Sequence, residues 1–159
     1  VTLCGIPNWE GVASMSADGI INGYSGSASI TYIVDTVKND VVMYAATATD
    51  VSFNVNSGNG CTATVNNVAA NLDADKSFLV INYNNNPASY SAGFFVNVSF
   101  TITCSNNVVT NTTTFPLLLG FDGEKPLSND NKTLAGSYNI PEANFTNTWN
   151  FTAVPRTNP

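Results

Sequence analysis

The chain contains no histidine, and its three cysteines, Cys4, Cys61 and Cys104, form no Cys-X-X-Cys pair. Zinc sites use cysteine and histidine at short spacing, so the sequence predicts no such site. Hydrolases with a serine or cysteine nucleophile normally use a histidine base, which is absent here. A glycosidase needs two carboxylates flanking a cleft, and no pair among the eleven acidic residues is distinguished by its context. We therefore expect no metal, no cofactor and no catalytic activity, and an enzyme is only the third interpretation.

Charge is also scarce, because charged residues make up 10% of the chain, against roughly 25% in an average soluble protein. The five basic residues are scattered singly, whereas nucleic acids and anionic lipids are bound by clusters of Lys and Arg. No apolar run approaches the ~20 residues of a membrane-spanning helix. No signal-peptide pattern begins at Val1, so we expect the mature form if the chain is secreted.

Apolar residues alternate with polar ones through much of the chain, and helical spacing is almost absent. The clearest stretch is Phe94 to Cys104, in which every second residue is apolar. Polar turns separate the alternating segments, a pattern typical of a β-sandwich or barrel. The predicted strands, about eight in number, are Ala28–Val34, Val41–Ala48, Val51–Val55, Cys61–Val65, Phe78–Tyr83, Phe94–Cys104, Phe115–Phe121 and Phe145–Val154.

The stretch that precedes Ser27 lacks this alternation and is rich in Gly and Ser. We predict that residues 1–26 form an irregular N-terminal arm or loop region and that residues 27–159 form the sandwich domain. Phe78 to Ile81 is apolar at every position, which favours a central strand covered on both faces.

The cysteines favour one disulfide. Cys61 shares a strand face with Ala63 and Val65, and Cys104 ends its strand on the apolar side, so both are predicted to face the core. A Cys61–Cys104 bridge would close a loop of about 43 residues and stabilise the fold by roughly 4 kcal/mol in the chain-entropy model. Pairing of Cys4 with either of the others stays an alternative. A disulfide indicates an oxidising compartment.

Amides and hydroxyls replace charge on the predicted surface. Asparagine is abundant, and five asparagines begin Asn-X-Ser/Thr acceptor sequences for N-glycosylation, at Asn97, Asn111, Asn131, Asn144 and Asn150. Asn97 and Asn150 are predicted on the polar faces of strands, and Asn111 and Asn131 in loops. Unmodified surface asparagine is the alternative at each position.

The segment from Cys61 to Cys104, which ends in VSFTITC, resembles the disulfide-bearing half of pilin-type subunits. Such subunits have an incomplete immunoglobulin-like sandwich that a strand from the neighbouring subunit completes. The low charge and the many acceptor sequences are similar to those of archaeal surface filaments, including glycosylated thread-like filaments. This resemblance implies an immunoglobulin-like fold with a core disulfide, a homopolymer, N-linked glycans and a place at the cell surface.

The chain differs from bacterial pilins in carrying a long additional stretch before Cys61, the first matching cysteine. The donor strand is therefore either the arm around Val1–Leu3 or the segment Ile20–Val34. Ala28, Ile30, Tyr32 and Val34 alternate in the way that insertion into a neighbour's groove requires. An ordinary strand within the chain gives the same pattern.

Two shorter resemblances lead to an alternative function. CGIPNWEG, from Cys4, resembles the start of ependymin-related secreted proteins, and the segment from Phe53 to Cys61 resembles lysosome-associated membrane glycoprotein domains, which carry four cysteines. The first resemblance implies a lipid-binding β fold, and the alternative function is a soluble secreted module for a carbohydrate or an apolar ligand. Trp9, in an irregular segment, and Tyr90, beside a polar turn, are the candidates for stacking on a sugar. The preferred hypothesis is an extracellular structural or adhesive glycoprotein that assembles into a surface filament by donor-strand complementation.

Overall fold

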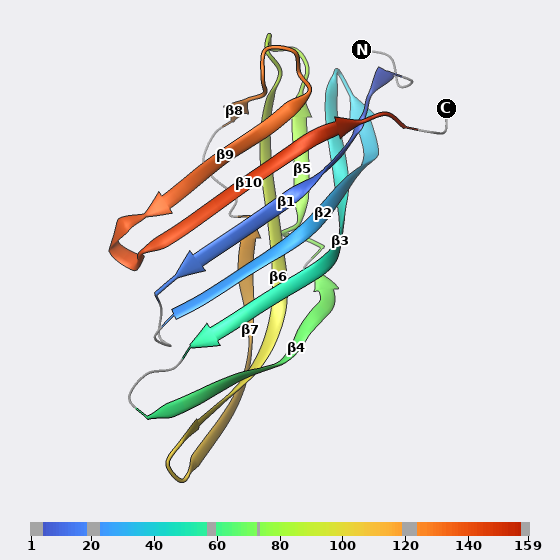
Figure 1. The fold of residues 1–159 in the computed structure, drawn as a ribbon. Coiled ribbons are helices and arrows are strands. Elements are labelled where there is room, and N and C mark those ends of the chain that lie inside the picture. Colours follow the sequence, from blue (N-terminus) through green and yellow to red (C-terminus); the bar gives the residue numbers. More distant parts are fainter. Residues whose placement is uncertain (1–4, 19–22, 57–59, 73, 119–123, 157–159) are drawn as a thin grey trace.

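The computed structural model describes residues 5–18, 23–56, 60–72, 74–118 and 124–156 (Figure 1). Within these residues the chain forms strands, turns and short 3-10 segments such as Pro141–Ala143, so the all-β prediction is confirmed. The strands are β1 (Asn8–Ala17), β2 (Gly23–Lys38), β3 (Val41–Asn56), β4 (Cys61–Leu72), β5 (Phe78–Asn82), β6 (Ser89–Cys104), β7 (Asn107–Leu118), β8 (Lys125–Pro126), β9 (Thr133–Ile140) and β10 (Phe145–Val154).

All described strand pairs are antiparallel, and the strand order is β4-β6-β5-β3-β2-β1-β10-β9, with β7 and β8 also paired to β6. The long strand β6 belongs to two sheets. Its residues 89–93 pair with β5, and its residues 94–104 pair with β4 and β7. We call β4, β7 and residues 94–104 of β6 the lower sheet, and the remaining strands the main sheet.

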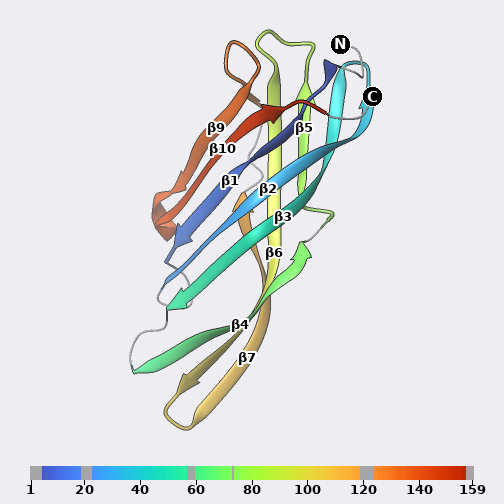
Figure 2. The same cartoon turned by 45° about the vertical axis from the view of Figure 1, so that its right-hand side comes forward.

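The strands form the two layers of a sandwich, and the main sheet contributes strands to both layers (Figures 1 and 2). Strands β9, β10, β1, β2 and β3 cross in front of β6 and β7, and the β6–β7 hairpin continues past them at the end of the molecule opposite the two termini. One buried cluster fills the space between the layers and includes Met15, Ile30 and Phe151 from the front strands and Phe94 and Val98 from β6. Burial of such side chains contributes about 25 cal/mol per Å² of apolar surface removed from water.

Aromatic side chains join the layers through polar atoms as well as through apolar contact. The Tyr32 hydroxyl donates to the Gly93 carbonyl oxygen (3.0 Å), and the Trp149 indole N–H donates to the Tyr90 hydroxyl (2.8 Å). Both bonds lie in the buried interior, where a polar group without a partner would cost free energy. They therefore fix the position of β6 relative to β2 and β10.

Strand β1 was missed by the sequence pattern. The prediction of an irregular region over residues 1–26 is wrong for Asn8–Ala17, which lies between β2 and β10 in the middle of the main sheet. Small residues in this strand make the alternation of apolar and polar residues hard to detect. Glycine is needed at position 11 because a Cβ there would overlap the Asn150 backbone carbonyl oxygen. The close approach of β1 and β10 thus requires glycine, a residue that sequence rules assign to turns.

Other predicted strands are recovered with changed limits. Val41–Ala48 and Val51–Val55 belong to one strand, β3, whose pairing with β2 shifts register between Ser27 and Ser29. Phe78–Ile81 lies in β5, which is central as predicted, although Phe78 and Val80 are only half-buried. Strand β9 was not predicted. The predicted residues 119–121 lie outside the described chain.

Candidate functional site

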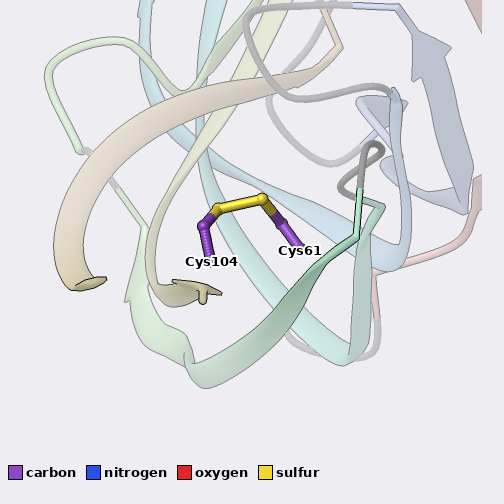
Figure 3. The surroundings of a disulfide bond; sticks show 2 residues. All are labelled: Cys61 and Cys104. Carbon is purple, nitrogen blue, oxygen red and sulfur yellow. A yellow bond between two sulfur atoms is a disulfide. The ribbon is translucent and has the colours of Figure 1, made fainter. Parts of the chain in front are cut away.

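The Cys61–Cys104 disulfide is present (Figure 3). The two residues face each other across β4 and β6, with their Cα atoms 4.3 Å apart. Both are half-buried, so the bridge joins neighbouring strands of the lower sheet and does not link the two layers. The two cysteines lie on the strand faces that carry Ala63, Val65 and Ile102, which pack against the core, as predicted, but they are only partly covered there. Cys4 lies outside the described residues.

The lower sheet uses neutral polar contacts on its outer face. The Thr101 hydroxyl accepts a hydrogen bond from the Asn66 side-chain amide (2.5 Å) and is 3.1 Å from the Thr110 hydroxyl. The Thr114 hydroxyl donates to the side-chain Oδ1 of Asn97 (2.6 Å). The chain has no charged residue from Ser77 to Phe121 and none within β4. The lower sheet therefore presents a surface without charge.

Four strands lie at the edges of the sheets. Among the described residues, β9 pairs with β10 alone, and β4, β7 and the two-residue strand β8 each pair with β6 alone. Strand β8 consists of Lys125 and Pro126, whereas β4, β7 and β9 contain no charged residue. Natural edge strands are usually protected from pairing with another chain by charge, proline or bulges. The edge of β4 carries two register shifts and β7 carries Pro116, whereas the pairing of β9 with β10 is regular.

The proposed sugar-stacking role of Trp9 and Tyr90 is contradicted. Both side chains have no exposed surface. The Trp9 indole N–H donates to the Tyr44 hydroxyl (3.2 Å), and Tyr90 accepts from Trp149. The irregular sequence around Trp9 suggested exposure, but β1 lies between two strands and turns this side chain into the core.

The segment offered as a donor strand completes the chain's own sheet. Ala28, Ile30 and Tyr32 are buried and Val34 is half-buried on β2, which pairs with both β1 and β3. The interpretation of these four residues as a free donor is therefore wrong, and the alternative, an ordinary intramolecular strand, is what is observed. Val1–Leu3, the other donor candidate, lies outside the described residues.

The five acceptor asparagines occupy different environments. Asn150 is exposed on β10, and Asn144 is exposed after the 3-10 helix, where its amide donates to Asp18 (2.8 Å). Asn97 is half-buried on β6. Asn131 lies in a loop, as predicted, and its side-chain Oδ1 accepts from the Ala88 backbone N–H (3.0 Å).

Asn111 was predicted in a loop, and that placement is wrong. It belongs to β7, opposite Phe100 of β6. The predicted loop came from a run of Asn and Thr that carries no apolar alternation, yet this run pairs through its backbone with the regular strand β6.

A depression of about 650 Å³ opens at the end that carries the termini. Its lining combines Ile6 and Tyr83 with the charged residues Asp130, Lys132 and Arg156. The hydroxyls of Tyr83 and Tyr44 are 3.4 Å apart, and burial raises the pKa of both. Hydrogen bonds from the Ser128 hydroxyl and the Lys132 amide hold the pKa of Asp130 below its ordinary value.

Exposed apolar side chains were not singled out in the sequence, because alternation alone does not show which strand face is covered. Ile33 and Met43 are exposed on the main sheet, and Val108 and Val109 on the β6–β7 hairpin. By contrast, the described residues contain no group of three or more Cys, Asp or Glu side chains placed to hold a metal ion.

No helix in the described part of the chain has the length and apolar character to cross a membrane. Comparison with protein families, with curated proteins and with solved structures found no match to this chain.

Proposed function

We propose that the chain is an extracellular structural or adhesive glycoprotein whose copies assemble into a surface filament by β-strand addition. The observation that carries this proposal is the edge strand β9, which is regular, uncharged and paired on one side only in the described chain. Such an edge offers backbone amides and carbonyls in the pattern that another strand requires.

The side chains of β9 support the same proposal. Leu134 is buried on its inner face, whereas Tyr138 and Ile140 on that face remain half-buried while packing against the core cluster. A strand added beside β9 would cover more of this apolar surface. Because β2 is already part of the chain's own sheet, the added strand comes from another segment or another copy.

The disulfide supports an oxidising, extracellular setting. The low charge and the exposed acceptor residues Asn144 and Asn150 agree with a glycosylated surface. The immunoglobulin-like character of the sandwich belongs to this proposal and follows from the pilin resemblance.

Size measurement of the purified chain, with negative-stain electron microscopy, tests the proposal. We expect wild-type protein to form chains, and the double variant Ala135→Lys/Ser137→Lys on β9 to form far fewer. The matched control is Ser16→Lys/Thr148→Lys, which adds the same two charges at exposed positions on the central strands β1 and β10 and leaves the acceptor sequences intact. A wild-type protein that remains monomeric at high concentration would overturn the proposal.

The depression beside the termini supports a second candidate, a secreted binding module. Its tyrosine and its mixed charges suit a small polar ligand such as a sugar. A glycan array on which wild-type protein binds and Arg156→Ala does not would favour this alternative, provided that the variant keeps the wild-type unfolding midpoint.

A further inference from the structure

A sugar attached to asparagine is bulky, so the folded chain must leave room around the side-chain nitrogen that carries it. Two of the five acceptor asparagines are held by their neighbours. Asn97 is half-buried, and its Oδ1 accepts from the Thr114 hydroxyl (2.6 Å). Asn131 is also half-buried, and its Oδ1 accepts from the backbone N–H of the buried Ala88 (3.0 Å). Both side chains are therefore fixed against other parts of the chain and only partly accessible.

Two further acceptors are constrained in other ways. The register of β7 places Asn111 opposite the buried Phe100 of β6, and directly opposed residues share a sheet face. Asn144 is exposed, but its side-chain nitrogen, the atom that a sugar would occupy, already donates to the Asp18 carboxylate (2.8 Å). The remaining acceptor is Asn150.

Asn150 lies on the outer face of the central strand β10, which runs between β1 and β9 (Figure 1). It is exposed, and so is Thr152, the hydroxyl residue that completes its acceptor sequence. Phe151 between them is fully buried, because successive side chains of a strand point to opposite faces. The buried phenyl ring anchors the strand, while both polar side chains of the acceptor sequence face outward.

An exposed apolar side chain lies directly beside this acceptor. Val12 of β1 is opposite Asn150 and is 52% exposed. The Cβ atoms of directly opposed residues are about 4.5–5.5 Å apart, so the first sugar on Asn150 reaches Val12. On the other side of Asn150, Ala135 of β9 offers only a methyl group. The larger apolar surface therefore lies toward β1.

Hydroxyl groups surround Val12 on the same face of the sheet. The Ser14 hydroxyl is 2.9 Å from the Thr148 hydroxyl of β10, and Ser29 of β2 lies opposite Val12. One charged residue, Glu10, lies two positions from Val12 on β1 and so shares this face. A sugar ring has an apolar face of C–H groups and a rim of hydroxyls. It can therefore cover the valine while its rim keeps hydrogen-bond partners.

We infer that Asn150 carries an N-linked glycan whose first sugars lie over Val12, on the outer face of β1 and β2. This inference rests on the proposed extracellular glycoprotein and deepens it, because it names the modified residue and the surface that the sugar covers. A glycan directed toward β1 leaves the edge of β9 open for strand addition. It also prevents the outer faces of two copies from stacking, so assembly uses the edges.

The covalent step joins Nδ2 of Asn150 to the anomeric carbon of an oligosaccharide that is activated on a lipid phosphate. The bond between this carbon and the phosphate oxygen breaks, and the lipid phosphate leaves with the electron pair. One of the two Nδ2 protons passes to a base of the cellular transferase, so the product amide keeps one N–H donor and its carbonyl oxygen. No oxidation or reduction takes place.

Peptide mapping of the chain secreted from a glycosylating eukaryotic host tests the site. Enzymatic removal of N-glycans in heavy-oxygen water converts each modified asparagine to labelled aspartate, and fragmentation of the peptide that contains Asn144 and Asn150 locates the label. We expect label at Asn150 in wild type and in Thr152→Ser, and an at least tenfold loss in Thr152→Ala, because Ser or Thr must complete the acceptor sequence. Secreted wild-type protein with Asn150 unlabelled would overturn the inference.

NMR spectra of the intact glycoprotein test where the sugar lies. We expect nuclear Overhauser effects between the Val12 methyl groups and the sugar ring protons, and none at Val108, an exposed valine (64%) on the β6–β7 hairpin. Thr152→Ala is a second control, since it removes the sugar and keeps Val12. A modified Asn150 whose sugar makes no contact with Val12 would overturn the inference.

Size measurement of the same samples distinguishes failure of this inference from failure of the proposed filament. Chains formed by protein with an unmodified Asn150 would overturn the glycan and leave the filament standing. A protein that stays monomeric while its sugar contacts Val12 would overturn the filament and support the glycan.

Discussion

The main and lower sheets share strand β6 but are held together by different means. On the main sheet, buried Trp and Tyr side chains bond across the layers, as in the pairs Tyr32–Gly93 and Trp149–Tyr90. The lower sheet contains no Trp, no Tyr and no charged residue. It is joined by threonine and asparagine contacts and by one disulfide. A covalent bridge is thus used where the hairpin leaves the shared core and burial declines.

The contrast between the sheets is also a contrast in what each exposes. The charged residues of the described chain belong to the main sheet and the loops, and the aromatic interior beneath them is closed. The lower sheet ends in an uncharged apolar tip. We therefore attribute stability chiefly to the main sheet, and the proposed contact with other copies would use the free edges.

The largest effect is expected in the aromatic core. Trp149→Ala should lower the free energy of unfolding by roughly 5 kcal/mol, since Trp→Ala changes in cores cost about 3–5 kcal/mol and a buried hydrogen bond to Tyr90 is also lost. Trp149→Phe keeps most of the apolar volume and should cost about half as much. Chemical denaturation checks both values. A loss for Trp149→Ala that falls clearly below the range for buried aromatic residues would contradict the assignment of stability to this core.

Removal of the disulfide should rank second. Cys61→Ser/Cys104→Ser frees a loop with a sequence separation of 43 and should lower stability by about 4 kcal/mol in the chain-entropy model. Hydrogen exchange should accelerate first in β4 and β7, while β1 and β2 keep their protection. Uniform acceleration across both sheets would mean that they unfold as one unit, and the distinction between them would be lost.

Alkaline pH should weaken the main sheet selectively. Burial raises the pKa of Tyr32, Tyr44, Tyr83 and Tyr90 above the ordinary value of 10.0. The unfolded chain therefore releases these protons first, so stability is complete below pH 10 and is lost as the pH rises beyond it. Urea midpoints at pH 8 and pH 11 measure the loss. Tyr32→Phe, which cannot ionise there, should show a smaller difference between the two.

The smallest effect is expected at the surface turn. The Ser128 hydroxyl and the Lys132 amide lower the pKa of Asp130 from its ordinary value of 3.8. A lowered folded pKa gives stability that is present above this value and lost as the pH falls through the folded pKa. Asp130→Asn should therefore flatten the acid limb of the stability curve slightly, whereas Glu10→Gln, exposed on β1, serves as a control. An unchanged acid limb would contradict a role for this carboxylate.

Some of these features were predictable and others were not, for reasons visible at single residues. The alternation from Phe94 to Cys104 predicted β6, and the opposite cysteine on a second strand predicted the bridge. Strand β1 was not predicted because Gly11 and its small neighbours interrupt the alternation of apolar and polar residues. Glycine is required at position 11 because the backbone of β10 approaches closely there. Trp9 looked exposed because nothing near it in sequence reveals that β2 and β10 flank it.

Local alternation and composition were enough to predict the all-β class and the scarcity of charge, because these are properties of neighbouring residues. The sequence favoured the Cys61–Cys104 bridge but left Cys4 as an alternative, and the pairing of β4 with β6 decided between them. The folded chain was needed to establish that β2 completes its own sheet and that Trp9 and Tyr90 are buried. It was also needed to reveal the open edge of β9 and the exposed hairpin tip. Such features depend on which strands pair and where one layer ends, and those contacts join residues far apart in the chain.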